Sequence, residues 1–349
     1  MLLRAEYIWI DGTQPTKELR SKTRILQQGT KELQVSDLPQ WGYDGSSTNQ
    51  APGKQSDLIL HPVSIVRDPL RGEPNILVMC EVFNFDGTPH ETNTRAVLRH
   101  AMDSGGRDHD PYVGIEQEYT MLQNGRPYRW PKQGFPKPQG PYYCSVGASR
   151  AIGRELVEAH TKACMDAGIL IYGTNAEVMP SQWEFQIGYR GFEGESGDPL
   201  TVADHLWLAR WLLHRIGEDH GIEVTLDSKP VKGDWNGSGA HTNFSTKEMR
   251  DPKVGWKAIT AMVDALSKNH SSHIAVYGSG LEERLTGLHE TCDINTFRSG
   301  ELDRGASIRI PEPTSKKRYG YIEDRRPGAN ADPYQVCAQL LKTLATIKA

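Results

Sequence analysis

Glu116 and Glu118 lie two residues apart in GIEQEYTML, residues 114–122, a stretch with the composition of a β-strand. Side chains alternate between the two faces of a strand, so both carboxylates belong to one face and are about 7 Å apart. Two carboxylates on one face repel each other unless a cation or water lies between them. The stretch is therefore either a solvated strand face or part of a metal site.

Further predicted strands have the same design, with apolar side chains on one face and polar ones on the other. These strands are SQWEFQIG, GAHTNFS, ASIRIPEP and GYIEDRR, and GTNAEVMP adds a glutamate just before a proline. The polar positions are Glu116, Glu118, Glu177, Glu184, Gln186, His241, Asn243, Ser245, Ser307, Arg309, Tyr321, Glu323 and Arg325.

Five glutamates, one histidine and no lysine are unusual for a solvated face. Carboxylate oxygens with one imidazole are the ligands that hard divalent cations such as Mg²⁺ or Mn²⁺ accept. Unpaired carboxylates that are buried raise their pKa and take up protons, so a buried cluster of this kind needs cations. If these strands are neighbours, the sequence predicts a metal site.

Four arginines supply a second chemical group: Arg284 in ERLTG, Arg304 in LDRGAS, Arg309 and Arg325. Metal ions with arginines suggest phosphoryl transfer, in which catalysis consists mostly of positioning and charge neutralisation. A lone arginine can also form a surface salt bridge, and we expect this for Arg326. No P-loop sequence and no G-x-G-x-x-G after a strand is found, so a nucleotide would be held by metals and arginines.

The bulk composition excludes several classes of protein. The 349 residues include 40 Lys and Arg against 44 Asp and Glu, a net charge of −4 that gives no general attraction to nucleic acid or to anionic membranes. The chain contains no run of about 18 apolar residues, the length that a helix needs to span a bilayer. The five cysteines are scattered and never spaced C-x-x-C, so we expect a soluble cytoplasmic protein without a disulfide framework.

The chain divides near residue 90. Before it, AEYIWIDG, LRSKTRIL and NILVMCEVF are predicted strands, and residues 41–57 are predicted to be a loop. After a linker at 85–95, strands mix with longer helices. The predicted domains are therefore residues 1–90 and 91–349, and residues 124–149 contain too many prolines and glycines for a regular element.

Five helices are predicted in the second part, and they do not alternate strictly with the strands. One begins at about residue 94, one ends at Gly168, and one begins at Thr201 with Asp204 as a capping partner. A fourth covers about 256–269, and the last runs from Asp332-Pro333 to the end of the chain. This order predicts an α+β fold rather than a doubly wound sheet.

At this point the sequence resembles a known family. The blocks GIEQEYT, GFPKPQGPYYCSVGA, GTNAEVMPSQWEFQIG, GDWNGSGAHTNFSTKEMR, RLTGLHET and GYIEDRRPGANADP, with the early YDGSST, resemble glutamine synthetase, in the shorter type of eukaryotes and some bacteria. The likeness is collinear over nearly the whole chain. It implies a small N-terminal β-grasp domain, a catalytic domain with a curved antiparallel sheet flanked by helices, and ATP-dependent joining of glutamate and ammonia through a γ-glutamyl phosphate.

The resemblance also implies roles for single residues. Two or three Mg²⁺ or Mn²⁺ ions would bind in each site, one held by Glu118, Glu177 and Glu184 and another by Glu116, His241 and Glu323. L-glutamate would be bound by Arg284, Arg325, Asp234, Trp235 and Gly237. ATP would be bound by Glu116, Glu184, Asn243, Phe244, Ser245, Arg304, Arg309 and Tyr321.

Three residues would act in catalysis by the same resemblance. Arg304 would face the ATP phosphates, and Glu290 matches a glutamate on a segment that closes over the intermediate. Asp44 matches an aspartate that takes a proton from ammonium in the active site of the neighbouring subunit. A ring assembly is therefore implied, with two stacked pentamers making a decamer. Asp234 and Lys137 depart from residues that are common in the family, and Asp234 adds a negative charge beside the glutamate site.

Two other functions remain open at this stage. A ligase of the same fold could join the γ-carboxylate of glutamate to a larger amine, such as a polyamine. A non-catalytic structural relative is the second alternative. Asp44 and Glu290 favour ammonium over a bulky amine, and the presence of every matched metal-binding and arginine position argues against a non-catalytic protein.

Overall fold

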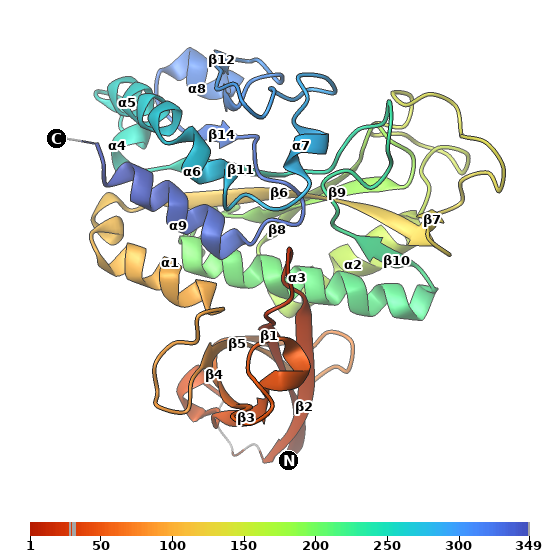
Figure 1. The fold of residues 1–349 in the computed structure, drawn as a ribbon, viewed down its shortest axis with the longest axis vertical. Coiled ribbons are helices and arrows are strands. Elements are labelled where there is room, and N and C mark those ends of the chain that lie inside the picture. The colour runs from red at the N-terminus through yellow and green to blue at the C-terminus, as the bar shows by residue number, and fades with distance from the viewer. Residues whose placement is uncertain (28, 30–32, 348–349) are drawn as a thin grey trace.

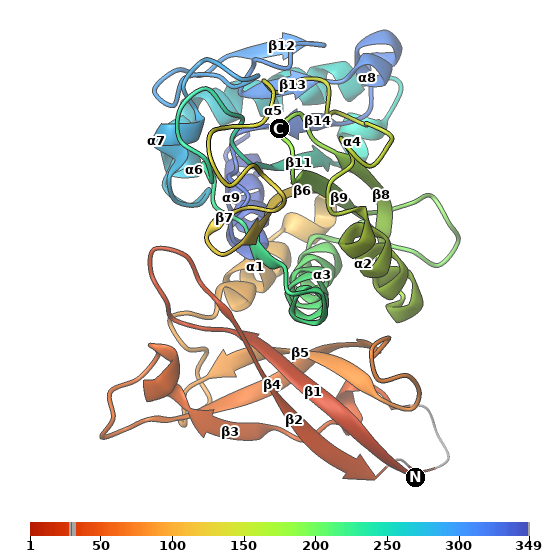
Figure 2. The same ribbon diagram turned by 90° about the vertical axis from the view of Figure 1, so that its right-hand side faces the viewer.

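The computed structural model describes residues 1–27, 29 and 33–347. A five-stranded sheet occupies residues 2–83, and a nine-stranded sheet forms the centre of the rest. Figures 1 and 2 show the small sheet at one end of the molecule, with a layer of helices between it and the larger sheet.

The small sheet has the strand order β2-β1-β5-β4-β3, in which β1 and β5 are parallel and all other neighbours antiparallel. This is the predicted β-grasp domain. Its strands and two short 3-10 helices are β1 (Leu2–Ile10), β2 (Leu19–Gln27), η1 (Val35–Asp37), β3 (Trp41–Asp44), η2 (Gly45–Thr48), β4 (Asp57–Arg67) and β5 (Ile76–Phe83).

Alternation along β1 explains how the small sheet is held. Tyr7 and Trp9 point into a core of its own, whereas Ile8 and Ile10 on the other face belong to the main hydrophobic core. Because both faces bury apolar side chains, the sheet is fixed against the helices above it.

The loop predicted over residues 41–57 is wrong at its beginning. Residues 41–44 form β3, which pairs with β4, and residues 45–48 form η2. Asp44 ends the strand and caps the 3-10 helix, since its side chain accepts a hydrogen bond from the Ser46 N–H. The polar composition of residues 41–57 suggested a loop because β3 is an edge strand of only four residues, which include a glycine and an aspartate.

The large sheet has the order β12-β13-β14-β11-β6-β9-β8, and β10 and β7 pair with β6 outside this path. All neighbours are antiparallel except β12 and β13, so the predicted antiparallel sheet is mixed at one edge. The strands are β6 (Tyr112–Gln123), β7 (Arg126–Pro127), β8 (Ile171–Ala176), β9 (Gln182–Gly188), β10 (Glu223–Thr225), β11 (Ala240–Ser245), β12 (Ser299–Glu301), β13 (Ile308–Ile310) and β14 (Ile322–Asp324). The two residues of β7 lie inside the segment predicted to be irregular.

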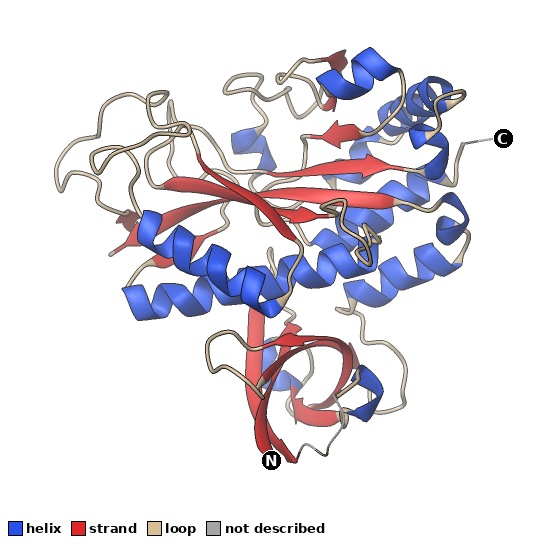
Figure 3. Ribbon diagram, turned by 180° about the vertical axis from the view of Figure 1, so that it is seen from behind, coloured by secondary structure: helices blue, strands red, loops and turns tan. Residues whose placement is uncertain are grey.

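Helices cover one face of this sheet, as Figure 3 shows from behind. The side chains that the sheet presents to them include Ile115, Tyr119, Trp183 and Phe185, all buried in the main core. The helices are α1 (Thr94–Asp103), η3 (Gly106–His109), α2 (Arg154–Ala167), α3 (Pro199–His220), α4 (Lys247–Arg250), α5 (Gly255–Lys268), α6 (His270–Ile274), α7 (Leu281–Arg284), α8 (Glu312–Lys317) and α9 (Pro333–Leu344). The opposite face is covered mainly by loops, with the short helices α7 and α8 among them.

The predicted start of α3 is two residues late. Asp198 caps the helix by accepting hydrogen bonds from the Leu200 and Thr201 N–H groups, and Pro199 is the first helical residue. Asp204, predicted as a capping partner, is buried instead and forms an ion pair with Arg95 at 2.7 Å. A charged residue near a helix start satisfies the capping pattern whether or not it faces the backbone, so the sequence could not separate the two roles.

The other helix limits agree better with the predictions. Gly168 ends α2 with a φ of +83°, and Asp332 caps α9 by accepting from the Tyr334 N–H. Helix α9 ends at Leu344 rather than at the end of the chain, and residues 348–349 lie outside the described residues. No helix within the described part of the chain is long and apolar enough to cross a membrane. The connection between β5 and α1 spans 84–93, and we keep residue 90 as the proposed boundary between domains 1–90 and 91–349.

Candidate active site

Strand register brings the predicted metal ligands together. On the polar face, His241 of β11 lies directly opposite Glu116 of β6, and Glu118 lies directly opposite Glu184 of β9. Directly opposed side chains on one face are close neighbours, and like charges there are destabilising. The arrangement therefore places repelling carboxylates next to one another, which calls for a compensating cation.

Glu323 joins the cluster from β14. It is buried, and its carboxylate accepts from Arg309 Nη1 at 2.7 Å and from Arg325 Nη1 at 2.5 Å. His241 Nδ1 lies 3.8 Å from Glu323 and 3.7 Å from Glu116. Ligand atoms of Glu116, His241 and Glu323 all lie within 4.8 Å of one another, as the resemblance implied.

The second cluster differs in one member from the predicted set. Glu118, Glu184 and His241 bring ligand atoms within 4.8 Å, and Glu177 is not part of that group. Glu177 follows β8 at the edge of the same cavity, where Asn175 Nδ2 donates to it at 2.8 Å. The acid is thus near the cluster but held by a neighbouring amide.

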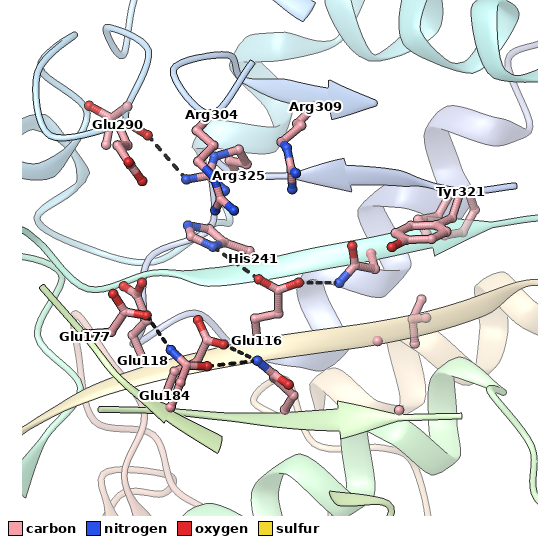
Figure 4. Close-up of a pocket in the computed structure, with 18 of the residues that line it drawn as sticks. Glu116, Glu118, Glu177, Glu184, His241, Glu290, Arg304, Arg309, Tyr321 and Arg325 are labelled. Atoms are coloured by element: carbon pink, nitrogen blue, oxygen red, sulfur yellow. Dashed lines mark hydrogen bonds and ion pairs between the residues drawn. The ribbon is translucent and has the colours of Figure 1, made fainter. Parts of the chain in front are cut away.

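A cavity of about 670 Å³ opens over these residues. Figure 4 shows four carboxylates on one side of the cavity and three arginines across from them, with His241 between the two groups. The carboxylates are those of Glu116, Glu118, Glu177 and Glu184, and the arginines are Arg304, Arg309 and Arg325. Among predicted site residues, the cavity is lined by Glu116, Glu118, Glu177, Glu184, Gly237, His241, Asn243, Phe244, Ser245, Arg284, Glu290, Arg304, Arg309, Tyr321 and Arg325. Glu323 lies behind this wall, beneath its two arginine partners.

Burial and mutual repulsion keep protons on this cluster. Burial, followed by the nearby carboxylates of Glu116 and Glu118, raises the pKa of Glu184 to about 9. Burial and then Glu118 raise the pKa of Glu177 to about 8. Burial raises the pKa of Glu118 to about 7, although Arg284 acts against it. A solvated strand face would show none of these shifts, so that alternative is excluded for Glu118 and for Glu184 opposite it.

His241 is kept neutral. Burial, followed by the charge of Arg325, lowers its pKa well below the usual value. Its Nε2 lies 3.0 Å from Arg284 Nη2, which can only donate, and this orients Nδ1 toward Glu116 and Glu323. The arginine places the ring proton on Nδ1, so a cation bound between Glu116 and Glu323 would displace that proton when this nitrogen ligates it.

Two arginines have donors without a protein partner. The Nε atoms of Arg309 and Arg325 are buried and make no hydrogen bond among the described residues. Each guanidinium is held by Glu323, and both side chains line the cavity. Buried, unpaired N–H groups beside a cavity are suited to an anionic ligand such as a carboxylate or a phosphate.

Glu290 lies on a loop above the cavity. We call residues 285–298 the flap. His289 and Glu290 have φ values of +52° and +59°, a region that favours glycine, and Arg325 Nη2 lies 3.4 Å from the Glu290 carbonyl oxygen. Strained backbone of this kind persists where surrounding structure enforces it and is frequent at functional sites.

Besides Glu323, three predicted site residues do not line the cavity. Asp44 is exposed on the small sheet, and hydrogen bonds from Ser46 and Ser47 lower its pKa to about 2. The Asp234 side chain is 98% exposed and lies 3.2 Å from His289 Nε2. Trp235 packs on Trp130 behind the cavity. The predicted roles of Asp234 and Trp235 therefore stay predictions, and the added charge of Asp234 faces His289 rather than the cavity.

Sequence reasoning missed several lining residues, among them Tyr143, Tyr172 and Asn236. Tyr172 passes beside Gly114 and Gly188, where a Cβ on Gly188 would come within 2.9 Å of the Gly114 Cα. Glycine at both positions allows β6 and β9 to approach closely. A glycine near one end of each strand is the sequence signal that could have indicated this close approach. Tyr143 lies in the irregular segment 124–149, which has no apolar–polar alternation to show which way a side chain points.

Comparisons with known proteins agree with this site. The chain matches the family model of the glutamine synthetase β-grasp domain over residues 3–85 and that of the glutamine synthetase catalytic domain over residues 91–275. It is 57% identical to a chloroplastic glutamine synthetase of Chlamydomonas reinhardtii over 352 residues, covering 98% of this chain and 90% of that protein. It is 54% identical to a glutamine synthetase of Streptomyces viridochromogenes, covering 98% and 97%.

The chain belongs to the glutamine synthetase family. A mouse glutamine synthetase is also 52% identical, covering 98% of this chain and 89% of that protein, so the likeness extends over eukaryotic and bacterial members. Like them, the chain is an ATP-dependent glutamate–ammonia ligase that uses divalent metal ions. The polyamine ligase and the non-catalytic relative are not favoured.

A solved structure titled "Apo GmaS without ligand" has the same fold. Its TM-score is 0.73, and the match covers 97% of this chain and 76% of that one. At 19% sequence identity, this likeness supports the architecture alone.

Proposed function

We propose that the cavity makes glutamine through a γ-glutamyl phosphate, with the substrates bound between the acidic cluster and the facing arginines. The observation that carries this proposal is the pair of clusters, each joining two glutamates to His241, opposite the unpaired Nε groups of Arg309 and Arg325. Catalysis of phosphoryl transfer consists mostly of positioning and charge neutralisation, and both sides of the cavity are built for that.

The donor set fits Mg²⁺ or Mn²⁺. All donors are carboxylate oxygens apart from one neutral imidazole, and three of the carboxyls have raised pKa values that a bound cation would bring down. We assign one ion to Glu116, His241 and Glu323 and another to Glu118 and Glu184, with Glu177 beside them. Bound there, the ions would neutralise the phosphate oxygens of ATP and the charge that develops during transfer.

The chain's own residues would divide the remaining work. Arg325, with Arg284 beside it and Gly237 in the adjoining turn, would bind the glutamate substrate. Arg309 and Arg304 would donate to phosphate oxygens, while Asn243, Phe244, Ser245 and Tyr321 line the part of the cavity that would hold the nucleotide. An oxygen of the glutamate γ-carboxylate would attack the terminal phosphorus of ATP, and the bond from that phosphorus to the bridging oxygen would break to release ADP. The carboxyl carbon, a poor electrophile, would then carry phosphate as a leaving group.

Ammonium has to be bound and deprotonated before it can attack. Asp44 is kept ionised by its serine partners, which suits it to bind a cation. It lies outside the cavity of its own chain, so we propose that it completes the site of a neighbouring subunit in a ring, in two stacked pentamers. Glu290 and the flap would exclude water, which would otherwise hydrolyse the acyl phosphate.

An assay of glutamine formation tests the proposal. With glutamate, ATP and ammonium, we expect glutamine and phosphate in equal amounts when Mg²⁺ or Mn²⁺ is present, and none after chelation. Comparing the two ions at equal free concentration gives the preference. Replacing ammonium by a polyamine is expected to give no product, and phosphate release only with the larger amine would overturn the choice of acceptor.

Chelation is also expected to change how stability depends on pH. Because the carboxyls of Glu118, Glu177 and Glu184 have raised pKa values, the folded chain binds more protons than the unfolded chain from about pH 4.5 up to about pH 9. In EDTA, the stability that these three carboxyls contribute is therefore greatest below this window and falls as pH rises through it. Bound metal favours the ionised carboxylates and should remove or reverse the fall.

Thermal unfolding measures this directly. Between about pH 6 and about pH 8.5, the Tm in EDTA should drop by several degrees, and saturating Mg²⁺ should abolish the drop. Glu184→Gln should flatten the slope in EDTA, whereas the exposed control Glu223→Gln should not. A Tm that rises with pH in EDTA would contradict the protonated cluster.

We propose a cytoplasmic location as well. The scattered, reduced-type cysteine pattern supports it, and cell fractionation followed by immunodetection tests it.

A further inference from the structure

Arg325 and Arg326, the two residues directly after β14, connect the end of this strand to the flap from its two faces. Arg325, on the cavity face, reaches the carbonyl of Glu290 at the tip of the flap. Arg326 is the next residue and points to the opposite face, where its Nη1 lies 3.1 Å from His270 Nδ1. The other ring nitrogen, His270 Nε2, lies 2.8 Å from the carbonyl oxygen of Ile294 in the flap.

The partners define the proton positions on His270. An arginine can only donate, so His270 Nδ1 accepts from Arg326. A carbonyl can only accept, so the proton of the neutral ring is on Nε2 and is donated to Ile294. The imidazole thus bridges β14 and the flap with both nitrogens used.

Arg326 is a rigid point of attachment. It is 2% exposed, and its Nε and Nη2 donate to the two oxygens of buried Asp324 at 2.9 and 2.7 Å. Asp324 also accepts from the Tyr277 hydroxyl at 2.8 Å, and Tyr277 is hydrogen-bonded to His273. The expected surface salt bridge of Arg326 is therefore wrong: the ion pair exists but is buried, and a bidentate pair in the interior fixes geometry.

The flap is attached at its base as well as at its tip, where Arg325 reaches the Glu290 carbonyl. The Ile294 N–H donates to the carbonyl of Leu285 at 2.9 Å, so the two ends of the loop meet there. The Phe297 ring lies 5.8 Å from the His270 ring and 5.5 Å from the Arg326 guanidinium. Ile294 and Phe297 are thus held by the same two side chains, while Glu290 lies between the ends.

We propose that His270 is a positioning residue that fixes the base of the flap to β14 and so keeps Glu290 over the cavity while the acyl phosphate exists. The inference depends on the proposed role of the flap. Without the bridge, water reaches the intermediate: its oxygen bonds to the acyl carbon, the bond from that carbon to the phosphate oxygen breaks, and glutamate and phosphate are released. ATP is then consumed without glutamine.

The ratio of phosphate released to glutamine formed measures this loss. We expect equal amounts from the unaltered enzyme and at least about twice as much phosphate as glutamine from His270→Ala and His270→Asn. Asparagine is polar but too short to reach both partners. His270→Gln should restore the ratio, because a side-chain amide offers one acceptor and one donor at a spacing similar to that of the ring nitrogens.

A histidine elsewhere provides the matched control. His205 on α3 is likewise partly buried, and its Nδ1 accepts from the backbone N–H of Leu170 at 3.1 Å. His205→Ala should lower stability and leave the ratio unchanged. If His270→Ala does not fold, the asparagine and glutamine variants decide alone.

Each outcome has a distinct meaning. Equal phosphate and glutamine from His270→Asn, or the same excess of phosphate from His270→Gln as from His270→Asn, overturns the inference. Glu290→Ala, measured alongside, separates the two proposals. If Glu290→Ala releases excess phosphate and the His270 variants do not, only the bridge is wrong; if Glu290→Ala keeps the ratio, the proposed flap role fails and the inference falls with it.

Discussion

Glutamine formation should fall by at least about a thousandfold when Glu323 is replaced by glutamine. The change removes a carboxylate from the cluster with Glu116 and His241, and it leaves Arg309 and Arg325 without their shared anion. Because Glu323 is buried, water cannot replace the lost charge. The turnover number at saturating substrates should fall by this factor, and calorimetry should show that the affinity for Mn²⁺ is lost.

The control is a glutamate of the same chain outside the cavity. Glu301→Gln, at an exposed position on β12, removes the same charge and should change the turnover number by less than about twofold. Circular dichroism would show that Glu323→Gln remains folded. A folded Glu323→Gln variant that kept more than about a tenth of its activity would contradict the assignment of this residue to a metal.

Asp44→Ala is expected to lower glutamine formation at least about a hundredfold and to leave ATP binding unchanged. The carboxylate is exposed on the small sheet and does not line the cavity of its own chain. Losing it removes the local cap of η2 but should leave the overall fold and the nucleotide site intact. The main loss is expected in the binding and deprotonation of ammonium in a neighbouring subunit. Steady-state kinetics with varied ammonium, together with ATP titration, separates these effects.

Mixed assemblies test whether the site is shared. If Asp44→Ala and Glu323→Ala chains are unfolded together in equal amounts and reassembled, a site is complete when one chain supplies Glu323 and its neighbour supplies Asp44. Random mixing makes about a quarter of the sites complete, and activity should recover to about that fraction. Mixing Asp44→Ala chains with chains that carry both substitutions should recover no activity. If no mixture exceeds its parents, Asp44 does not act across subunits.

Local rules predicted much of the architecture. The two-residue alternation placed Glu116, Glu118, Glu184, His241 and Glu323 on the polar faces of their strands, and the structure confirms that these faces meet. Gly168 and Asp332 ended and began helices as predicted, since caps depend on one or two residues. The collinear blocks also predicted the family, which the comparisons confirm.

The errors occurred where neighbours distant in sequence decide the outcome. Residues 41–44 form a strand only because β4 pairs with them. Asp204 does not cap its helix because its carboxylate forms an ion pair with Arg95. Arg326 was expected at the surface, yet Asp324, Tyr277 and His270 enclose it in the interior. None of these partners is visible from a local pattern.

The sequence by itself determined which side chains share a face, the residue types that suit a hard cation, and the family, because these depend on alternation, donor chemistry and long collinear blocks. Only the tertiary structure decided which carboxylates are neighbours, since strand register between distant segments follows from packing. The same packing separated Asp44 from the cavity, moved Glu177 to the edge of its cluster, and joined Arg326 to the flap through His270. Burial then raised the pKa values that make the site ready for metal, because desolvation acts only on groups that the fold has enclosed.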